Sequence, residues 1–345
     1  MGGLIIDKKY RSKLSLRETE RAIKFIKDFF QTRLAAALRL QRVSAPLFVI
    51  SGAGINDDLN GGEKKVSFTV KDGNLPAEVV LSLAKWKRMA LANYGFRIGE
   101  GLYTDMNAIR PDEHLLDNLH SAYVDQWDWE RVVTAGQRDP AFLKTIVRKI
   151  YRTMRETELA VCARYTAIRP ILPKEIFFIH SEDLAAQYPG LSPRERECRI
   201  VQKHGAVFII GIGSALSDGR PHDNRAPDYD DWSTPTAKGR KGLNGDIFVW
   251  YPPLQTALEL SSMGIRVDKK ALLAQLKLKG AVSRKKMYWH KKLLAGGFPL
   301  TIGGGIGQSR LCMFFLRKLH IGEVQAGVWP EETRKKCAKA GIELL

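Results

Sequence analysis

The sequence predicts an α+β fold in which a mainly antiparallel β-sheet is flanked by helices. Two observations indicate this class. Strand-like apolar runs follow one another without the regular strand–helix alternation of a parallel α/β fold, and amphipathic helical segments lie before, between and after them. The chain has 345 residues, of which 44% are hydrophobic, and it contains neither an internal repeat nor a low-complexity linker. We therefore expect a single domain, residues 1–345.

The first predicted element is a long helix over residues 15–38, which begins at Ser15. Its apolar side chains recur at spacings of three and four and form one stripe: Ile23, Ile26, Phe30 and Leu34. A short apolar run at 47–50 follows Pro46 and predicts a strand. Because proline cannot donate to a ladder, this strand is expected at a sheet edge or an interface.

The remaining elements follow from apolar periodicity and length. Strands are predicted at 66–70, 79–83, 102–110, 122–132, 176–179, 206–212, 247–250 and 257–267. Helices are predicted at 139–164, 193–204, 268–277 and 308–319.

Composition excludes several classes of protein. The sequence has no run of 18 apolar residues, and its N-terminus lacks the apolar region of a signal peptide. The 4 cysteines are scattered without a CxxC pair, which argues against a disulfide framework or a zinc site and favours a reducing, cytoplasmic location. The net charge of +18 permits two interpretations, a solvated basic face or contact with RNA or another polyanion. Positive residues are densest at 269–292 and 334–339.

The strand predicted at 122–132 carries the first candidate site. A period of two places Gln126, Asp128 and Glu130 on one face, and Trp127 and Trp129 on the other. Three polar groups backed by two tryptophans suggest a polar floor for a small, polar ligand. The alternative is an ordinary amphipathic edge strand.

A glycine run provides a second candidate. In TIGGGIGQSRL, residues 303–307 permit close backbone approach, and a helix is expected from Gln308 with Arg310 in its first turn. The Gly-Lys-Ser/Thr ending of a P-loop is absent. The alternative is a tight strand–helix turn without a ligand.

Two carboxylates provide the third candidate. Asp246 and Glu259 lie in or beside apolar strands, where an unpaired charge is costly. A magnesium ion that bridges phosphate oxygens would explain both residues. The alternative is ion pairing with Arg266 or another basic residue.

Together these blocks resemble motifs two and three of class II aminoacyl-tRNA synthetases, and the helix ending at Leu38 with the strand at Pro46 resembles their dimer-forming motif one. The match extends to longer words that are similar to the ammonia-dependent asparagine synthetase family, or aspartate–ammonia ligases. The resemblance runs from about residue 15 to about residue 330, nearly all of the chain, and its words are SLAKWKR, GEGLYTDMNAIRPDE, YVDQWDWERV, RAPDYDDWSTP, LNGDI, ELSSMGIRVD, TIGGGIGQSRL and VQAGVWP. A departure is Asn56-Asp57-Asp58, where the family usually has Gln-Asp-Asn, so Asp57 and Asp58 both remain candidates.

The resemblance implies a class II synthetase-like catalytic domain without an anticodon-binding domain. It implies the conversion of aspartate, ammonia and ATP, with Mg²⁺, to asparagine, AMP and pyrophosphate through a β-aspartyl-adenylate. By resemblance, Arg110 binds the α-phosphate, and Arg310 holds the outer phosphates or the adenine face. Glu259 and Asp246 would bind Mg²⁺, and Ser262 in the same word would help bind ATP.

For aspartate, the resemblance assigns Lys87 to the substrate carboxylate and Asp128 to its α-ammonium group. Ser82 and Asp230 are implied as further substrate contacts. Gln126 would hydrogen-bond the activated acyl group, and Asp57 would bind ammonium and accept its proton.

The resemblance also implies a cytoplasmic homodimer, with no membrane or nucleic-acid partner. The alternative function is an RNA-binding paralogue of the class II synthetases, which the +18 charge would favour. Against it, the residues before 15 and after 330 are too few for an anticodon-binding domain.

Overall fold

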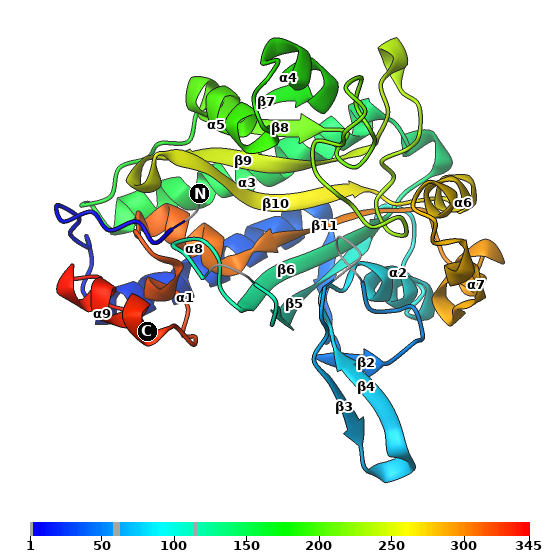
Figure 1. Cartoon of the computed structure of the whole chain (residues 1–345), viewed down its shortest axis with the longest axis horizontal. Coiled ribbons are helices and arrows are strands. Elements are labelled where there is room, and N and C mark those ends of the chain that lie inside the picture. Colours follow the sequence, from blue (N-terminus) through cyan, green and yellow to red (C-terminus); the bar gives the residue numbers. More distant parts are fainter. Residues whose placement is uncertain (1–2, 58–62, 114–115) are drawn as a thin grey trace.

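The computed structural model describes residues 3–57, 63–113 and 116–345. Within these residues, eight strands form one sheet in the order β1-β5-β6-β11-β10-β9-β8-β7 (Figure 1). The outer pairs β1–β5 and β7–β8 are parallel, and the five inner pairs are antiparallel. The prediction of a mainly antiparallel sheet is therefore confirmed. The strands are β1 (Leu40–Arg42), β5 (Gly101–Ile109), β6 (Tyr123–Val132), β7 (Phe177–His180), β8 (Ala206–Ile210), β9 (Asn244–Tyr251), β10 (Thr256–Ile265) and β11 (Thr301–Gly307).

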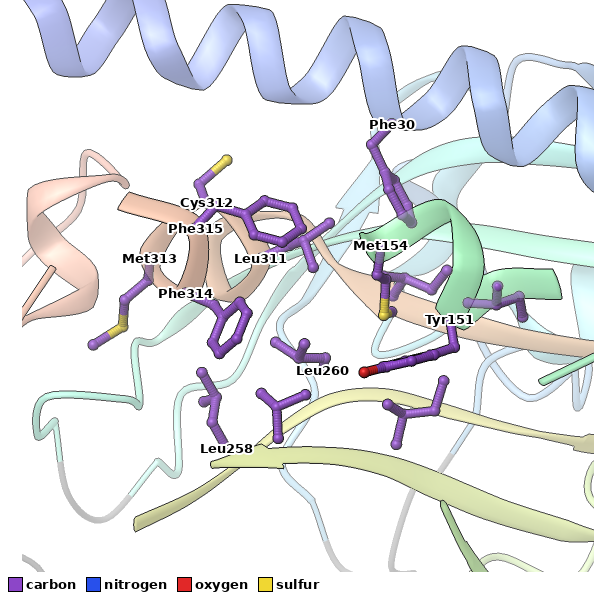
Figure 2. Packing of buried hydrophobic residues seen from close by; sticks show 14 of the residues in the cluster. Phe30, Tyr151, Met154, Leu258, Leu260, Leu311, Cys312, Met313, Phe314 and Phe315 are labelled. Carbon is purple, nitrogen blue, oxygen red and sulfur yellow. The ribbon is translucent and has the colours of Figure 1, made fainter. Parts of the chain in front are cut away.

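Three helices pack against one face of the sheet: α1 (Leu16–Leu38), α3 (Pro140–Arg164) and α8 (Gln308–Leu316). Figure 2 shows their apolar side chains meeting those of β10. The predicted stripe of α1 supplies three fully buried residues, Ile26, Phe30 and Leu34. A capping box between Ser15 and Glu18 satisfies backbone donors at the start of α1, as the position of Ser15 predicts.

The two tryptophans of β6 face this core. Trp127 and Trp129 are fully buried, and the ring of Trp127 lies 4.8 Å from that of Phe30. Because successive side chains of a strand point to opposite faces, Gln126 and Asp128 lie on the face away from α1. That face carries the candidate site.

A separate three-stranded sheet, in the order β2-β4-β3, projects from the main body (Figure 1). It consists of β2 (Phe48–Ile50), β3 (Ser67–Val70) and β4 (Leu75–Val79). The strand predicted after Pro46 is β2, and it lies at an edge as the proline indicates. The strand that continues α1 into the main sheet is instead β1, which the sequence analysis missed because it has only three residues.

The remaining helices surround the sheet: α2 (Ala84–Asn93), α4 (Ser181–Gln187), α5 (Pro193–His204), α6 (Lys269–Leu278), α7 (Tyr288–Leu294) and α9 (Glu331–Lys339). The predicted helices at 139–164, 193–204, 268–277 and 308–319 correspond to α3, α5, α6 and α8. Among the described residues, no helix combines the length and apolar character needed to cross a membrane.

Two local predictions are wrong. The strand expected at 79–83 ends at Val79, and residues 80–83 lead into α2, which was not predicted. Val80, Leu81 and Leu83 are buried without joining a strand ladder, so their apolar character does not indicate a strand. Leu83 precedes α2 and has no capping side chain that would mark the start of the helix.

The second concerns the glycines at 303–307: the alternative of a tight strand–helix turn is wrong, whereas the helix expected from Gln308 is present as α8. The structure places the glycines in β11, a central strand between β6 and β10, and not in a strand–helix turn. Glycine has low strand propensity, so the pattern does not indicate a strand. Gly305 lies opposite Asp128 in the ladder, so its missing side chain leaves space over the floor of the candidate site.

Candidate active site

A cavity of about 370 Å³ opens over β6, β10 and β11, on the sheet face opposite α1. Nine of the eleven predicted site residues line it: Ser82, Lys87, Arg110, Gln126, Asp128, Asp230, Glu259, Ser262 and Arg310. They come from segments separated by more than 200 positions in the chain. The fold therefore brings together residues that the sequence patterns suggested separately.

The glycines of β11 make room for the polar floor. A Cβ on Gly305 would lie 2.1 Å from Oε1 of Gln126 and 2.8 Å from Oδ1 of Asp128. A Cβ on Gly303 would lie 1.9 Å from Oε2 of Glu130. Any side chain at these two positions would therefore fill the space that the polar residues of β6 occupy.

A buried ion pair lies at one end of this floor. Nζ of Lys87, on α2, lies 3.1 Å from Oδ2 of Asp128 and donates a hydrogen bond of 3.0 Å to the carbonyl of Gly304. Both side chains are at most 3% exposed, and burial lowers the pKa of Lys87. The pair thus presents one positive and one negative group side by side, which matches the carboxylate and ammonium groups of an amino acid.

A second buried network lies behind the pair. Arg266 donates hydrogen bonds to both carboxylate oxygens of Glu130, at 2.9 to 3.1 Å, and also pairs with Asp230. Thr301 donates to Glu130 at 2.6 Å. Burial raises the pKa of Asp230. The carboxylates of Glu130 and Asp230 raise the pKa of Arg266. Arg266 therefore fixes Asp230 at the cavity wall and is not the partner of Asp246 that the sequence suggested.

Two arginines mark the other end of the cavity. Arg110 follows β5 directly, and its Nε is buried without a hydrogen-bond partner among the described residues. Burial and the charge of Arg310 both lower the pKa of Arg110. Arg310 donates to the carbonyl of Glu259 at 3.2 Å, and its Nη1 lies 3.6 Å from Oε2 of Glu259. Two neighbouring guanidinium groups with spare donors suit a polyphosphate.

Asp246 is buried beside this end but does not line the cavity. It forms an ion pair with Arg225, so its basic partner is Arg225 and not Arg266. Burial raises the pKa of Asp246 to about 7, and the nearby charge of Glu259 adds to this effect. Oδ1 of Asp246 accepts no hydrogen bond from the described residues.

These carboxylates are compatible with Mg²⁺. The described residues contain no cluster of three His, Cys, Asp or Glu side chains that would form a protein cage. Mg²⁺ at nucleotide sites is commonly held by one or two carboxylates together with phosphate oxygens and water. Glu259 and the uncommitted Oδ1 of Asp246 fit that pattern.

Asp57 lies just behind the cavity wall. It is fully buried, and its Oδ2 accepts hydrogen bonds from Oγ of Ser82 at 2.6 Å and from the amide of Ala84 at 3.2 Å. Burial raises the pKa of Asp57 to about 6. Of these residues, Ser82 and Ala84 line the cavity. The Ser82 hydroxyl therefore connects Asp57 to the cavity by a hydrogen bond. The other candidate, Asp58, lies outside the described residues.

Comparison with known proteins gives the family. The profile of the AsnA family, Aspartate-ammonia ligase, matches residues 17–341. The chain belongs to this family. The aspartate–ammonia ligases of Parabacteroides distasonis and Bacteroides thetaiotaomicron are 59% and 58% identical to it, and that of Lactobacillus delbrueckii subsp. bulgaricus is 54% identical, with all of each chain covered. The family resemblance predicted from the sequence words is confirmed.

The fold of this ligase family member is also that of class II synthetases. The asparaginyl-tRNA synthetase of Pyrococcus horikoshii, complexed with asparaginyl-adenylate, superposes with a TM-score of 0.66 at 16% identity. The alignment covers 91% of this chain and 70% of the synthetase. The corresponding synthetase of Entamoeba histolytica, also with asparaginyl-adenylate, gives 0.62 at 14% identity, covering 90% and 66%. The expected fold class is therefore confirmed.

Several residues in or behind the cavity could not be selected from the sequence patterns. Arg225 and Tyr229 line the cavity, and both lie in the word RAPDYDDWSTP. Asp228, in the same word, is fully buried behind the cavity. The word itself was the only available signal, because an irregular segment between two strands has no periodicity that shows which side chains point inward.

Proposed function

We propose that this chain joins ammonia to the β-carboxylate of aspartate, cleaving ATP to AMP and pyrophosphate through a β-aspartyl-adenylate. One observation carries the proposal: the Lys87–Asp128 pair and the Arg110–Arg310 pair share one cavity. The first pair matches an amino acid, the second matches a polyphosphate, and a reaction between the two ligands requires both at one site.

The activation step follows from charge. Aspartate and ATP are both anionic, so positive groups must hold them together. Asp128 would bind the α-ammonium group of aspartate, and Lys87 would bind a carboxylate. Arg110, with an uncommitted buried donor, would bind the α-phosphate and stabilise the charge that develops there during attack by the β-carboxylate.

Other cavity residues have supporting roles in this step. Arg310 and Ser262 would hold the nucleotide, and Glu259 with Asp246 would hold Mg²⁺. When bound, Mg²⁺ would neutralise phosphate charge. Ser82 and Asp230 would contact aspartate from the opposite wall, where Arg266 keeps Asp230 in place.

The second step needs a proton acceptor, because ammonium has no lone pair. Asp57 is the proposed acceptor-side carboxylate, and its pKa of about 6 leaves it largely ionised near neutral pH. Its hydrogen bond with Ser82 provides a path for the proton from the cavity. Gln126, on the floor, would hydrogen-bond the activated acyl group.

We further propose a cytoplasmic homodimer in which residues 1–345 act as one catalytic domain. A single buried cluster extends from Leu14 to Ile342, which supports the single domain. Apolar side chains in and directly before β2 remain exposed in the single chain, at 53%, 45% and 48%: Leu47, Phe48 and Ile50. A two-fold interface with a second copy would cover them. A fully active monomer by light scattering at micromolar concentration would contradict this part.

The decisive test is incubation of the protein with aspartate, ATP, Mg²⁺ and ammonium. The proposal requires that asparagine, AMP and pyrophosphate accumulate in equal amounts. Formation of ADP and phosphate as the main products would refute the adenylate. The RNA-binding alternative would give no asparagine, together with retention of transfer RNA in a filter-binding assay.

A further inference from the structure

A row of buried charges lies behind Asp57 and does not line the cavity. Oδ1 of Asp57 is 3.5 Å from Nζ of Lys85, and the same Nζ is 3.4 Å from Oδ2 of Asp228. That Oδ2 also accepts from Nη1 of Arg284 at 3.0 Å and lies 2.9 Å from Nε2 of His290. The side chains of Asp57, Lys85, Asp228 and His290 are at most 2% exposed.

Three parts of the fold hold this row in place. Lys85 lies on α2, His290 on α7, and Asp228 in the segment between β8 and β9. Nε1 of Trp289, the neighbour of His290, donates a hydrogen bond of 2.8 Å to the carbonyl of Lys85. Lys85 thus has a fixed position between two carboxylates.

Burying several charged groups together does not by itself stabilise a fold, so this row calls for a functional explanation. Each buried ion loses its hydration, and well-packed apolar side chains of similar volume are often no less stabilising than a buried ion pair. None of Lys85, Asp228 and His290 lines the cavity, so direct substrate binding does not account for them. Lys85 connects them to Asp57, the residue with a proposed role in the second step.

We propose that Lys85, held by Asp228, is a positioning residue for the attack of ammonia: its charge keeps the buried Asp57 carboxylate ionised and ready to accept a proton through Ser82. This inference rests on the proposed function. It assigns a role to Lys85 in the second step, distinct from that of Lys87, two positions later on the same helix.

The proton balance of that step shows why the charge of Asp57 matters. Ammonium gives one proton to the oxygen of Ser82 while the Ser82 hydroxyl proton moves to Asp57, which leaves neutral ammonia. The nitrogen lone pair then forms the C–N bond, and the C–O bond to AMP breaks with its electron pair on the phosphate oxygen. A second proton leaves the nitrogen for solvent. A protonated Asp57 could not accept the first proton.

The charges around Asp57 act in both directions. Burial raises its pKa, and the positive charges of Lys85 and Arg266 and the hydrogen bond from Ser82 lower it. The negative charge of Asp228 raises it, and Tyr229 also faces the carboxylate. The result is a pKa of about 6, with Lys85 as the largest opposing influence on the effect of burial.

The test compares Lys85→Met, Lys85→Arg and Asp228→Asn with the parent. Asparagine formation at saturating ammonium is measured from about pH 5.5 to about pH 9, and each rate is divided by the parent rate so that ammonium ionisation cancels. Aspartate-dependent ATP–pyrophosphate exchange, measured over the same range, reports activation alone. Loss of the lysine charge in Lys85→Met should move the acid limb of asparagine formation up by about one pH unit or more.

The other two variants test the direction in which the acid limb of asparagine formation moves. Lys85→Arg keeps the charge and should leave the acid limb closer to that of the parent. Asp228→Asn removes the negative charge that opposes Lys85, so the acid limb should move to lower pH. A merely structural role would not produce shifts in opposite directions. Pyrophosphate exchange should stay within about threefold of the parent in all three variants.

Several results would overturn the inference. An acid limb unmoved in Lys85→Met, shifts of the same sign in Lys85→Met and Asp228→Asn, or a parallel fall of exchange and synthesis would each do so. If Lys85→Met does not fold, as judged by thermal unfolding, Asp228→Asn and Lys85→Arg still test the sign. Absence of asparagine from the parent would instead refute the proposed function, so the two failures are distinguishable.

Discussion

Gly305→Ala should disable the candidate site while leaving the fold intact. Gly305 lies opposite Asp128 in the ladder between β11 and β6, where its missing side chain leaves room for Gln126. The added Cβ would lie 2.1 Å from Oε1 of Gln126 and 2.8 Å from Oδ1 of Asp128. Ordinary contact begins near 3.4 Å, so the Gln126 oxygen must move by about 1.3 Å and Asp128 by a smaller amount.

The size of the effect follows from that displacement. A misplacement of about 1 Å in a positioned group can cost on the order of 100-fold in rate, which corresponds to about 2.7 kcal/mol in activation free energy. We therefore expect kcat/KM for aspartate in pyrophosphate exchange to fall about 100-fold. The free energy of unfolding should fall by less than about 1 kcal/mol, because the atoms that must move are the ends of side chains.

Gly304→Ala is the matched control on the same strand. Its Cβ would point to the other face and lie 2.6 Å from the carbonyl oxygen of Ser262 and 2.5 Å from Cβ of Met263. Because backbone cannot move as freely as a side-chain end, this variant should lose about 1–3 kcal/mol of stability. Thermal unfolding and pyrophosphate exchange measure the two effects separately. Normal aspartate kinetics in folded Gly305→Ala would refute the assignment of the polar floor.

Four further predictions follow from the site and the core. Arg110→Ala should lower pyrophosphate exchange by about 100-fold or more, since it removes a charge partner of the transition state, and near-normal exchange would rule out the α-phosphate role. Asp57→Asn should retain measurable pyrophosphate release but depress asparagine formation, with partial rescue at higher pH or by hydroxylamine; equal losses in both would make the residue structural. In the parent, burial raises the pKa of Asp57 to about 6 and the ionised form accepts the proton, so asparagine formation relative to exchange should fall below about pH 6 and stay level above it. Away from the cavity, Glu158→Gln should destabilise the fold by about 3 kcal/mol and leave kcat unchanged. Nη2 of the buried Arg317 lies 2.6 Å from Oε1 of Glu158, and the substitution removes this counter-charge. An unchanged midpoint of denaturant unfolding would contradict the prediction.

Sequence periodicity was most informative where burial follows one regular repeat. The stripe of α1 and the alternation of β6 each predicted which side chains enter the core, and Phe30 and Trp127 do meet there. Periodicity failed where burial is not periodic. Residues 80–83 are apolar without being a strand, and α2 begins without a capping side chain.

The candidate site shows the same division. Gln126 and Asp128 could be proposed from their places on a strand, and the words of the family resemblance added Arg110 and Lys87. The sequence did not reveal that Asp246 pairs with Arg225 or that Asp57 lies behind Ser82. It also gave no reason to select Lys85, Asp228 and His290, since none belongs to a periodic polar face.

The sequence by itself determined the class of fold, the main helices, most strands of the large sheet and the family, because these depend on local periodicity and on words read along the chain. Only the tertiary structure decided that the glycines of 303–307 form a central strand and that charges from α2, α7 and the β8–β9 segment meet behind Asp57. The physical reason is that ion pairing and burial depend on distances in space. Asp57 and Asp228 are separated by 171 positions in the sequence, yet both lie within 3.5 Å of one lysine nitrogen.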